Sequence, residues 1–492
     1  MAGGRRVALG EALDPFVLAL DVGSTASRGD LYDAAGRPVE GERLKIRHEF
    51  RTAGDGTSEI DPDQVADELA EIVSGLSARP VQDRVGGVAM DTFASSLVGV
   101  GADGRAVTPC YSYADSRCGA QAAALRDEFD EAEVQQRTGC RLHSSYLPAR
   151  LRWLRETDQE RFSGAKRWMS LGEYAYLRLI GTTAAGTSTA AWTGFLDRRT
   201  GCWDAELLAA AGVESDRLSE VRDPDQPLQE VDDSVASRWP ALAGVRWFAP
   251  IADGFASNLG TGAADATTAA VAAATSGAIR VLVEEIPERI PSGLWCYRVD
   301  SRRSLLGGAV NDVGRMVSWL QETLQLAEAD LNELLIAAPD PETPLVLPYL
   351  TGERSTGWAA DARALIAGVS SASTASLIFR GAMEGVALSY ARIAKQLATT
   401  TADPQRIVAS GRVLKNLPNW LQVLADVLNA PVDPVTVKRA TLHGTAVHAL
   451  EVLAPETDRP PADTAETMHP SPDHRGYYKD RAAEYERLYQ AI

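Results

Sequence analysis

The sequence has few cysteines, no long apolar run and no surplus of positive charge. Its five cysteines are scattered and form no Cys-x-x-Cys pair, so neither a disulfide framework nor a zinc site is indicated. Free thiols suit a reducing compartment, and we predict a cytoplasmic protein. No apolar segment reaches membrane-spanning length, and residues 1–14 are expected to form a loose tail rather than a signal peptide.

The net charge of -18 argues against nucleic acid and against an anionic membrane as partners. It does not exclude an anionic small molecule, because a local group of N–H donors, arginines and Mg²⁺ can outweigh the global field. The length of 492 residues suits two large domains. The oligomeric state, with a homodimer among the options, is left open.

Two nucleotide-binding signatures are also absent from the sequence. It contains neither Gly-x-x-x-x-Gly-Lys-Ser/Thr nor a dinucleotide fingerprint, which disfavours P-loop and NAD-binding folds. Segment 207–240 is polar and acidic, as is typical of an exposed connection.

The most informative segment that is present runs from Phe16 to Arg28. Its apolar residues predict a strand buried on both faces, which ends in Asp21 and continues into the turn Gly23-Ser24-Thr25. Free N–H groups in such a turn can cradle an anion. A carboxylate beside a phosphate cradle indicates a metal–nucleotide site, although an ordinary hairpin fits this segment equally well.

The second half of the chain repeats this pattern. Residues 269–274 predict a strand, Thr275-Ser276-Gly277 a hydroxyl–glycine turn, and residues 279–283 a returning strand. The repeat favours an internally duplicated fold. Further elements are predicted by periodicity and capping signals: a strand over 85–90 that ends at Asp91, and helices over 62–76, 147–154, 170–180, 383–397 and 478–489.

Three further segments carry side chains that could do chemistry. Asp253 precedes a small-residue helix, where it would be a helix cap or a general base. Asp115 and Arg117 could bind polyol hydroxyls or form a local ion pair. A strand, Gly411 and a helix follow one another near residue 410, which is a weak phosphate or adenine signal.

The order of these motifs resembles that of the FGGY carbohydrate kinases over about residues 15–455. The matching segments are 20–25 with Arg28, 113–117, 149–154, 253–254, 275–277, 348–354, 380–385, and 410–411 with 420–426. Several details resemble the gluconate kinase branch: Thr138-Gly139 with His143, Glu173-Tyr174, Ser257–Gly260, 275–280, and 352–354 with Trp358 and Asp361.

The resemblance implies an α/β fold of two actin-like (ribonuclease H-like) domains with a ligand cleft between them. It implies a tail over 1–14, an N-terminal domain over 15–255 for the sugar and a phosphate turn, and a C-terminal domain over 256–455 for the nucleotide. Residues 456–492 would form a tail with a surface helix.

The resemblance also implies ATP and Mg²⁺ as cofactors and assigns roles to individual residues. Asp253 would be the general base, and Asp21 would lie on the metal side. Substrate would be contacted by Ser95, Asp115, Arg117, His143 and Asp253. ATP would be bound by Gly23, Ser24, Thr25, Arg28, Thr275, Ser276, Gly277, Gly314, Gly411 and Asn416.

Two departures from the family pattern bear on specificity. Ser95 stands where members often have His, and Arg412 stands where a second Gly is usual. The function implied is phosphorylation of D-gluconate to 6-phosphogluconate. The alternatives are a pentulose kinase such as xylulokinase, and a non-catalytic sugar or nucleotide sensor on the same fold.

Overall fold

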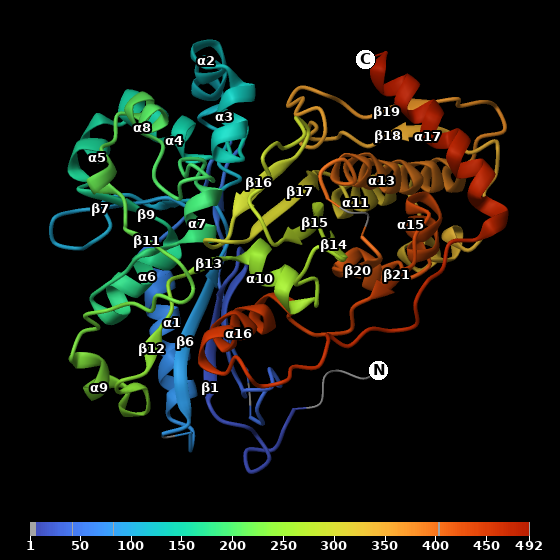
Figure 1. Ribbon diagram of the computed structural model, residues 1–492. Helices are drawn as coiled ribbons and strands as arrows, with labels where there is room; N and C mark the ends of the chain where they lie inside the picture. Colours follow the sequence, from blue (N-terminus) through green and yellow to red (C-terminus); the bar gives the residue numbers. More distant parts are fainter. Residues whose placement is uncertain (1–5, 42, 82, 402–403, 492) are drawn as a thin grey trace. The chain divides into compact units, whose positions relative to one another are not determined.

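The computed structural model describes residues 6–41, 43–81, 83–401 and 404–491, and its contacts divide them into two compact units (Figure 1). The first unit takes the chain up to Gly260, then Cys296–Leu305 and Lys438–Pro461. The second takes Thr261–Trp295, Leu306–Val437 and the chain from Ala462 onward. Each unit is therefore discontinuous in sequence.

The first unit is built on a sheet with strand order β12-β6-β1-β2-β3, to which β13 adds beside β6. Its strands are β1 (Phe16–Val22), β2 (Ala26–Tyr32), β3 (Leu44–Arg47), β6 (Val85–Thr92), β12 (Arg246–Trp247) and β13 (Ile251–Ala252). β1 pairs antiparallel with β2 and parallel with β6. The unit also contains shorter strands outside this sheet: β4 (Arg51–Thr52), β5 (Ser58–Ile60), β7 (Val98–Val100), β8 (Cys110–Tyr111), β9 (Arg167–Met169), β10 (Ala185–Gly186) and β11 (Val221–Arg222).

Both faces of this sheet are covered, as the apolar run in β1 predicts. Leu18 and Leu20 belong to a core shared with α1 (Pro62–Ser77), whereas Val17 and Ala19 belong to a core shared with α16 (Ala440–Leu453). Alternate side chains of a strand point to opposite faces, so the two helices lie on opposite sides of β1.

The remaining helices of the first unit follow the capping signals closely. Asp61 caps α1, and Ser170 with Glu173 forms a capping box at α6 (Leu171–Ile180). The other helices are α2 (Gly119–Glu128), α3 (Glu131–Thr138), α4 (Leu147–Thr157), α5 (Gln159–Gly164), α7 (Thr187–Trp192), α8 (Ala205–Ala211), α9 (Ser234–Arg238) and α10 (Asp253–Gly260).

The second unit repeats the hairpin, with β14 and β15 in a sheet of order β16-β17-β15-β14-β20-β21. The strands are β14 (Thr268–Ala273), β15 (Gly277–Val283), β16 (Trp295–Arg298), β17 (Ser304–Val310), β20 (Arg406–Ser410) and β21 (Val432–Pro434), with a separate pair β18 (Leu345–Leu347) and β19 (Leu365–Ala367). β14 pairs antiparallel with β15 and parallel with β20, as β1 does with β2 and β6. The predicted duplication is confirmed.

The helices of the second unit include the long α13 (Ala375–Leu397) and the C-terminal α17 (Arg475–Gln490). α17 buries Tyr478 and Tyr485 on one side. The others are α11 (Gly314–Thr323), α12 (Glu328–Leu331), α14 (Arg412–Asn416) and α15 (Trp420–Leu428).

Two expectations about loose segments are wrong. Residues 1–5 of the predicted tail lie outside the described residues, but Val7 bridges to Val39 and Arg6 pairs with Asp30 at 2.6 Å. Segment 207–240 contains α9 and buries Val235 and Trp239 in the core around α1 and α6. The prediction failed because the segment is polar overall, and its few buried apolar residues do not stand out in the composition.

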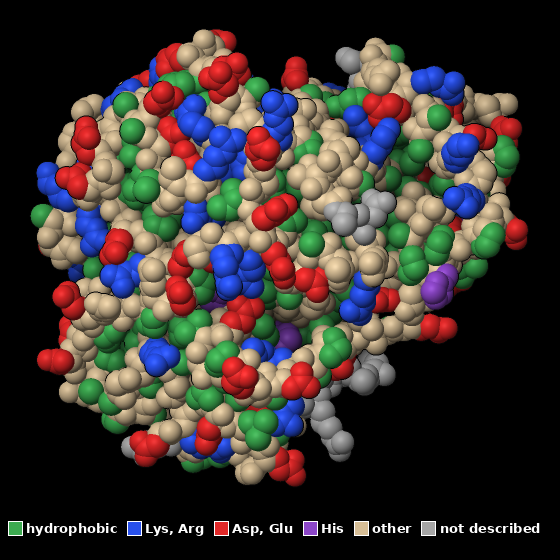
Figure 2. All heavy atoms as spheres, in the orientation of Figure 1, with side chains coloured by type: hydrophobic (Ala, Val, Ile, Leu, Met, Phe, Trp, Pro, Cys, Tyr) green, Lys and Arg blue, Asp and Glu red, His purple; other side chains and the backbone are tan. Residues whose placement is uncertain are grey.

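The surface carries charges of both signs. On the face drawn in Figure 2, acidic and basic side chains are interspersed with apolar ones. None of the helices in the described parts of the chain combines the length and apolarity needed to cross a membrane.

The close crossing of α10 and α16 generates a prediction. A Cβ added to Gly444 would lie 1.8 Å from the carbonyl oxygen of Ala256. We expect Gly444→Ala to lower the free energy of unfolding by about 3 kcal/mol, the upper end of the usual cost of overpacking, because backbone cannot move aside as a side chain can. Urea unfolding measures this change. Gly119→Ala is the control, since a Cβ there meets nothing within 4 Å.

Candidate active site

Three aspartates stand at the ends of adjacent strands of the first unit. The register of β1 and β6 pairs Asp21 with Asp91, and Ile251 of β13 pairs with Asp91 two residues before Asp253. Parallel strands end at the same sheet edge, so all three carboxyl groups belong to that edge. Asp91 is fully buried, Asp21 is 6% exposed and Asp253 is half-buried.

Each buried carboxyl group has one strong partner. Arg28 donates to Asp21 at 2.8 Å, and the hydroxyl of Thr445 on α16 donates to Asp91 Oδ2 at 2.6 Å. Asp91 Oδ1 is buried, and the side chains of Asp91 and Asp21 interact directly. Burial, with the charges of Asp21 and Asp253, raises the pKa of Asp91 well above its usual value. Burial also raises the pKa of Asp21, against the opposing effect of Arg28.

The turn after β1 brings several predicted residues together. Arg28 reaches from β2 to Asp21 and, at 3.4 Å, to the hydroxyl of Thr25. Gly23 lies under this guanidinium, and an added Cβ would be 2.8 Å from Arg28 Nη1. Ser24 and Thr25 are exposed. Asp21, Gly23, Thr25 and Arg28 thus form one cluster.

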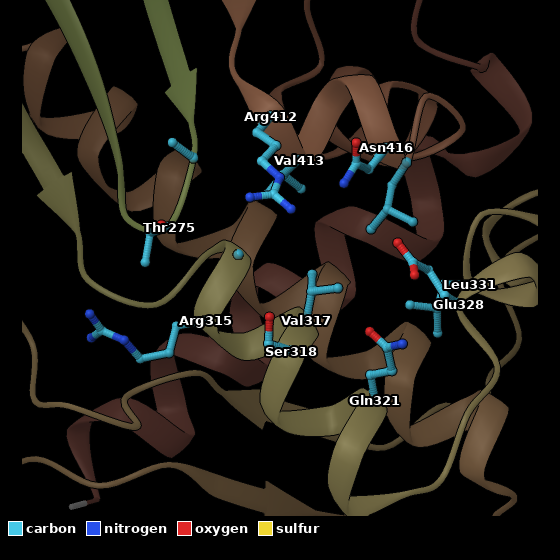
Figure 3. Close-up of a pocket in the computed structure, with 13 residues that line it drawn as sticks. Thr275, Arg315, Val317, Ser318, Gln321, Glu328, Leu331, Arg412, Val413 and Asn416 are labelled. Carbon is cyan, nitrogen blue, oxygen red and sulfur yellow. The ribbon is translucent and has the colours of Figure 1, made fainter. Parts of the chain in front are cut away.

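The second unit contains a cavity of about 360 Å³. Figure 3 shows three main segments of its lining, the β14–β15 turn at Thr275, the helix α11, and α14 with Arg412 and Asn416, to which α12 adds Glu328 and Leu331. This volume lies in the range of small-molecule sites. The lining residues are Ala274, Thr275, Gly314, Arg315, Val317, Ser318, Gln321, Glu328, Leu331, Arg412, Val413, Asn416 and Leu417.

Glycines let these three segments approach one another. The Gly314 amide donates to the Ala274 carbonyl at 2.9 Å, and an added Cβ would be 2.7 Å from that oxygen. Gly411 has φ 122°, and its Cβ would lie 2.2 Å from the carbonyl of Ala273. Gly277 packs against the Tyr390 hydroxyl in the same way. Thr275, Gly314 and Asn416 therefore line the cavity, while Gly411 and Gly277 support its walls.

Comparison with known proteins agrees with a fold of two units. The profile of the FGGY family of carbohydrate kinases, N-terminal domain, matches residues 16–260, and the profile of the family's C-terminal domain matches residues 269–451. The chain belongs to the FGGY family of carbohydrate kinases. The predicted resemblance and the two-domain α/β fold are confirmed.

Individual relatives of this FGGY kinase have different sugars in their names. It is 25% identical to the gluconokinase of Bacillus subtilis, over 85% of this chain and 83% of the other. Crystal structures of a gluconate kinase and of a ligand-bound xylulose kinase, both from Lactobacillus acidophilus, each have 26% identity and a TM-score of 0.90, and cover 97% of this chain and 98% of theirs.

The predicted sugar-side residues of the kinase are held by partners within the first unit. Ser95 has φ 57° and donates its hydroxyl to the Trp192 carbonyl at 2.6 Å. The Asp115 carboxylate accepts hydrogen bonds from the Arg117 guanidinium at 2.6 Å and from the Ser58 amide at 3.1 Å. Arg117 also pairs with Glu59 and stacks on Trp153.

His143 contacts Ser145 at 3.0 Å. The buried Arg150 of α4 connects the loops that carry Ser95 and His143. It donates to the carbonyls of Ser95 and Ser144 at 2.8 and 3.1 Å. Arg150 lies in segment 149–154, which resembles the family pattern, but only the fold reveals that it connects these loops.

Several site residues were missed by sequence reasoning. The sequence predicts Asp91 at a strand end without assigning it a role, and no local pattern indicates Thr445 because its partner Asp91 is 354 residues away. Val317, Ser318 and Gln321 follow Gly314 at helical spacing on α11, and that periodicity could have identified them. Arg412, which stands where the family pattern has a second Gly, extends its side chain toward the cavity between Thr275 and Asn416 in Figure 3.

The raised pKa of Asp91 makes stability depend on pH. Between the unfolded-state pKa near 4 and the higher folded-state pKa, the folded protein holds the extra proton, so wild-type stability falls as pH rises. Asn cannot ionise. We expect Asp91→Asn to gain stability relative to wild type, by more than about 1 kcal/mol from pH 5 to pH 8. Urea unfolding at both pH values measures this difference; a constant difference would contradict it.

Proposed function

We propose that this FGGY kinase phosphorylates a sugar or sugar acid with ATP and Mg²⁺, and that D-gluconate, giving 6-phosphogluconate, is its substrate. The observation that carries the reaction type is the position of Asp253. It stands at the start of α10, on the same sheet edge as Asp21 and Asp91, and it is half-buried where the other two are buried.

Asp253 is proposed as the general base. A carboxylate that solvent and substrate can reach is able to accept the proton of an attacking hydroxyl, whereas fully buried Asp91 is not. Phosphoryl transfer otherwise depends on positioning and on stabilisation of charge. Arg28 and the Gly23–Thr25 turn supply positive charge and N–H donors on the same unit.

ATP is proposed to bind the cavity of the second unit. The glycines at Gly314 and Gly411 let the segments around this cavity approach one another closely, and the cavity carries both an apolar wall and polar groups at Gln321 and Asn416. Its Thr275 end would take phosphates. Arg412 adds a guanidinium for a polyanion, whereas Arg315 is paired with Asp312 at 3.0 Å.

The residues present fit a magnesium ion on the first unit. Asp21 supplies a carboxylate beside Arg28, and the buried Oδ1 of Asp91 adjoins it. No three carboxylate, imidazole or thiol groups of the described chain form a metal-binding group, so phosphate and water would complete the coordination. When bound, Mg²⁺ would neutralise the charge of the transferring phosphoryl group.

Gluconate is supported by the gluconokinase of Bacillus subtilis and by the gluconate kinase structure of Lactobacillus acidophilus. A neutral pentulose is the second candidate, supported by the xylulose kinase structure and by one feature of the site. Arg117 is already shared by Asp115 and Glu59, so this cluster has no surplus positive charge for a sugar carboxylate.

A substrate panel tests the proposal. We expect ATP-dependent ADP release with D-gluconate that exceeds release with xylulose, ribulose and glycerol at equal concentration. Strong turnover of xylulose without response to gluconate would transfer the assignment to a pentulose kinase. Binding of sugars without turnover of any of them would indicate a sensor.

The general base has its own test. We expect Asp253→Asn to lower kcat by roughly 10²–10⁴-fold while the thermal unfolding midpoint stays near that of wild type. Asp103→Asn, in the exposed 101–105 turn, is the matched control and should keep full activity. Near-normal turnover in Asp253→Asn would remove this residue from the role.

A further inference from the structure

A buried histidine lies directly behind the turn that follows β1. His48 comes immediately after β3, which pairs with β2, so it reaches the end of the hairpin where the Gly23–Thr25 turn lies. Its side chain is fully buried. No pattern in the sequence singled it out.

His48 holds two carbonyl groups of this turn. Its ring nitrogen Nε2 lies 2.8 Å from the Gly23 carbonyl oxygen, and its backbone N–H donates to the Thr25 carbonyl at 3.3 Å. A carbonyl oxygen only accepts hydrogen bonds, so Nε2 carries the hydrogen and donates it.

Glu68 of α1 fixes the orientation of this ring. Its Oε2 contacts His48 Nδ1 at 2.8 Å and accepts the Ser27 hydroxyl at 2.7 Å, while Gln64 donates to its Oε1 at 3.0 Å. Glu68 is 7% exposed, so water competes little for these bonds. The ring therefore has one well-supported orientation.

Peptide geometry turns this contact into a statement about the opposite side of the turn. In a trans peptide unit the C=O and the following N–H point in opposite directions. Because the Gly23 carbonyl faces inward to His48, the Ser24 N–H faces outward. Ser24 is exposed, and within the described parts of the chain nothing accepts a hydrogen bond from its amide.

We infer that His48 is a positioning residue that aims the Ser24 N–H toward a bound phosphate by fixing the Gly23 carbonyl. The inference rests on the proposed function, in which this turn supplies N–H donors for transfer of a phosphoryl group from ATP. It adds a buried relay, from α1 through Glu68 and His48 to the turn, that no motif of the site contains.

Two substitutions at the same position separate positioning from packing. His48→Gln places an amide N–H near the position of Nε2 and can still donate to Gly23, whereas His48→Asn is too short to do so. Ser27→Ala is the matched control, because it removes a different hydrogen bond from Glu68 and leaves the Gly23 contact intact.

Two readouts apply to all three variants: hydrogen–deuterium exchange of residues 20–28, and KM for ATP at saturating sugar. We expect His48→Asn to speed exchange and to raise KM for ATP about tenfold, with KM for sugar unchanged. His48→Gln should stay within about threefold of wild type on both readouts. Ser27→Ala should match wild type, even if its unfolding midpoint falls.

Equal effects of Asn and Gln at position 48, or an equal effect of Ser27→Ala, would overturn the inference, since packing alone would then explain them. Faster exchange in His48→Asn without a change in KM for ATP would also overturn it. Exchange is measured without turnover. If wild type phosphorylates no sugar, the proposed function fails, and exchange alone decides whether His48 fixes the turn.

Discussion

The register of β1 against β6 is the constraint on which the first unit depends. It places Asp21 beside Asp91 where neither is well hydrated, so both carboxyl groups need partners from other elements. Arg28 comes from the neighbouring strand, but Thr445 comes from α16. That helix can approach only because Gly444 offers no side chain to α10, the helix that begins with Asp253. One strand pairing therefore links the carboxyl groups to the helix packing.

The two repeats carry the same hairpin with different side chains. In the first, β1 contains a carboxylate near its end, and the turn is held from behind by a buried imidazole and Arg28. In the second, β14 ends in alanines, and the turn is held by packing of Gly277 against Tyr390. An apolar strand end suits a cavity that accepts a nucleotide, whereas a charged end suits metal and proton chemistry. Duplication supplied the geometry, and single side chains supplied the difference.

Local features of the chain were predictable from sequence, and distant pairings were not. The buried strand at Phe16, the cap at Asp61 and the repeated turn at Thr275 depend on neighbours within a few residues, so composition and spacing specify them. The contact of Thr445 with Asp91 depends on strand register and helix crossing, which no local pattern encodes. Apolar anchors in segment 207–240 were missed for the same reason, since they have no periodicity of their own.

The predicted sugar-side residues show why a family name does not fix the substrate. Ser95 replaces an expected His, and its hydroxyl is used to hold its own loop to the Trp192 carbonyl. The neighbouring loop at Ser144 is fixed by Arg150, whose guanidinium donates hydrogen bonds to the carbonyl oxygens of Ser95 and Ser144. Rigid backbone can select a sugar by shape, but an anionic sugar also needs a positive charge that is not already neutralised. With Arg117 shared between two carboxylates, the choice between gluconate and a neutral pentulose depends on which cation a substrate carboxylate would meet.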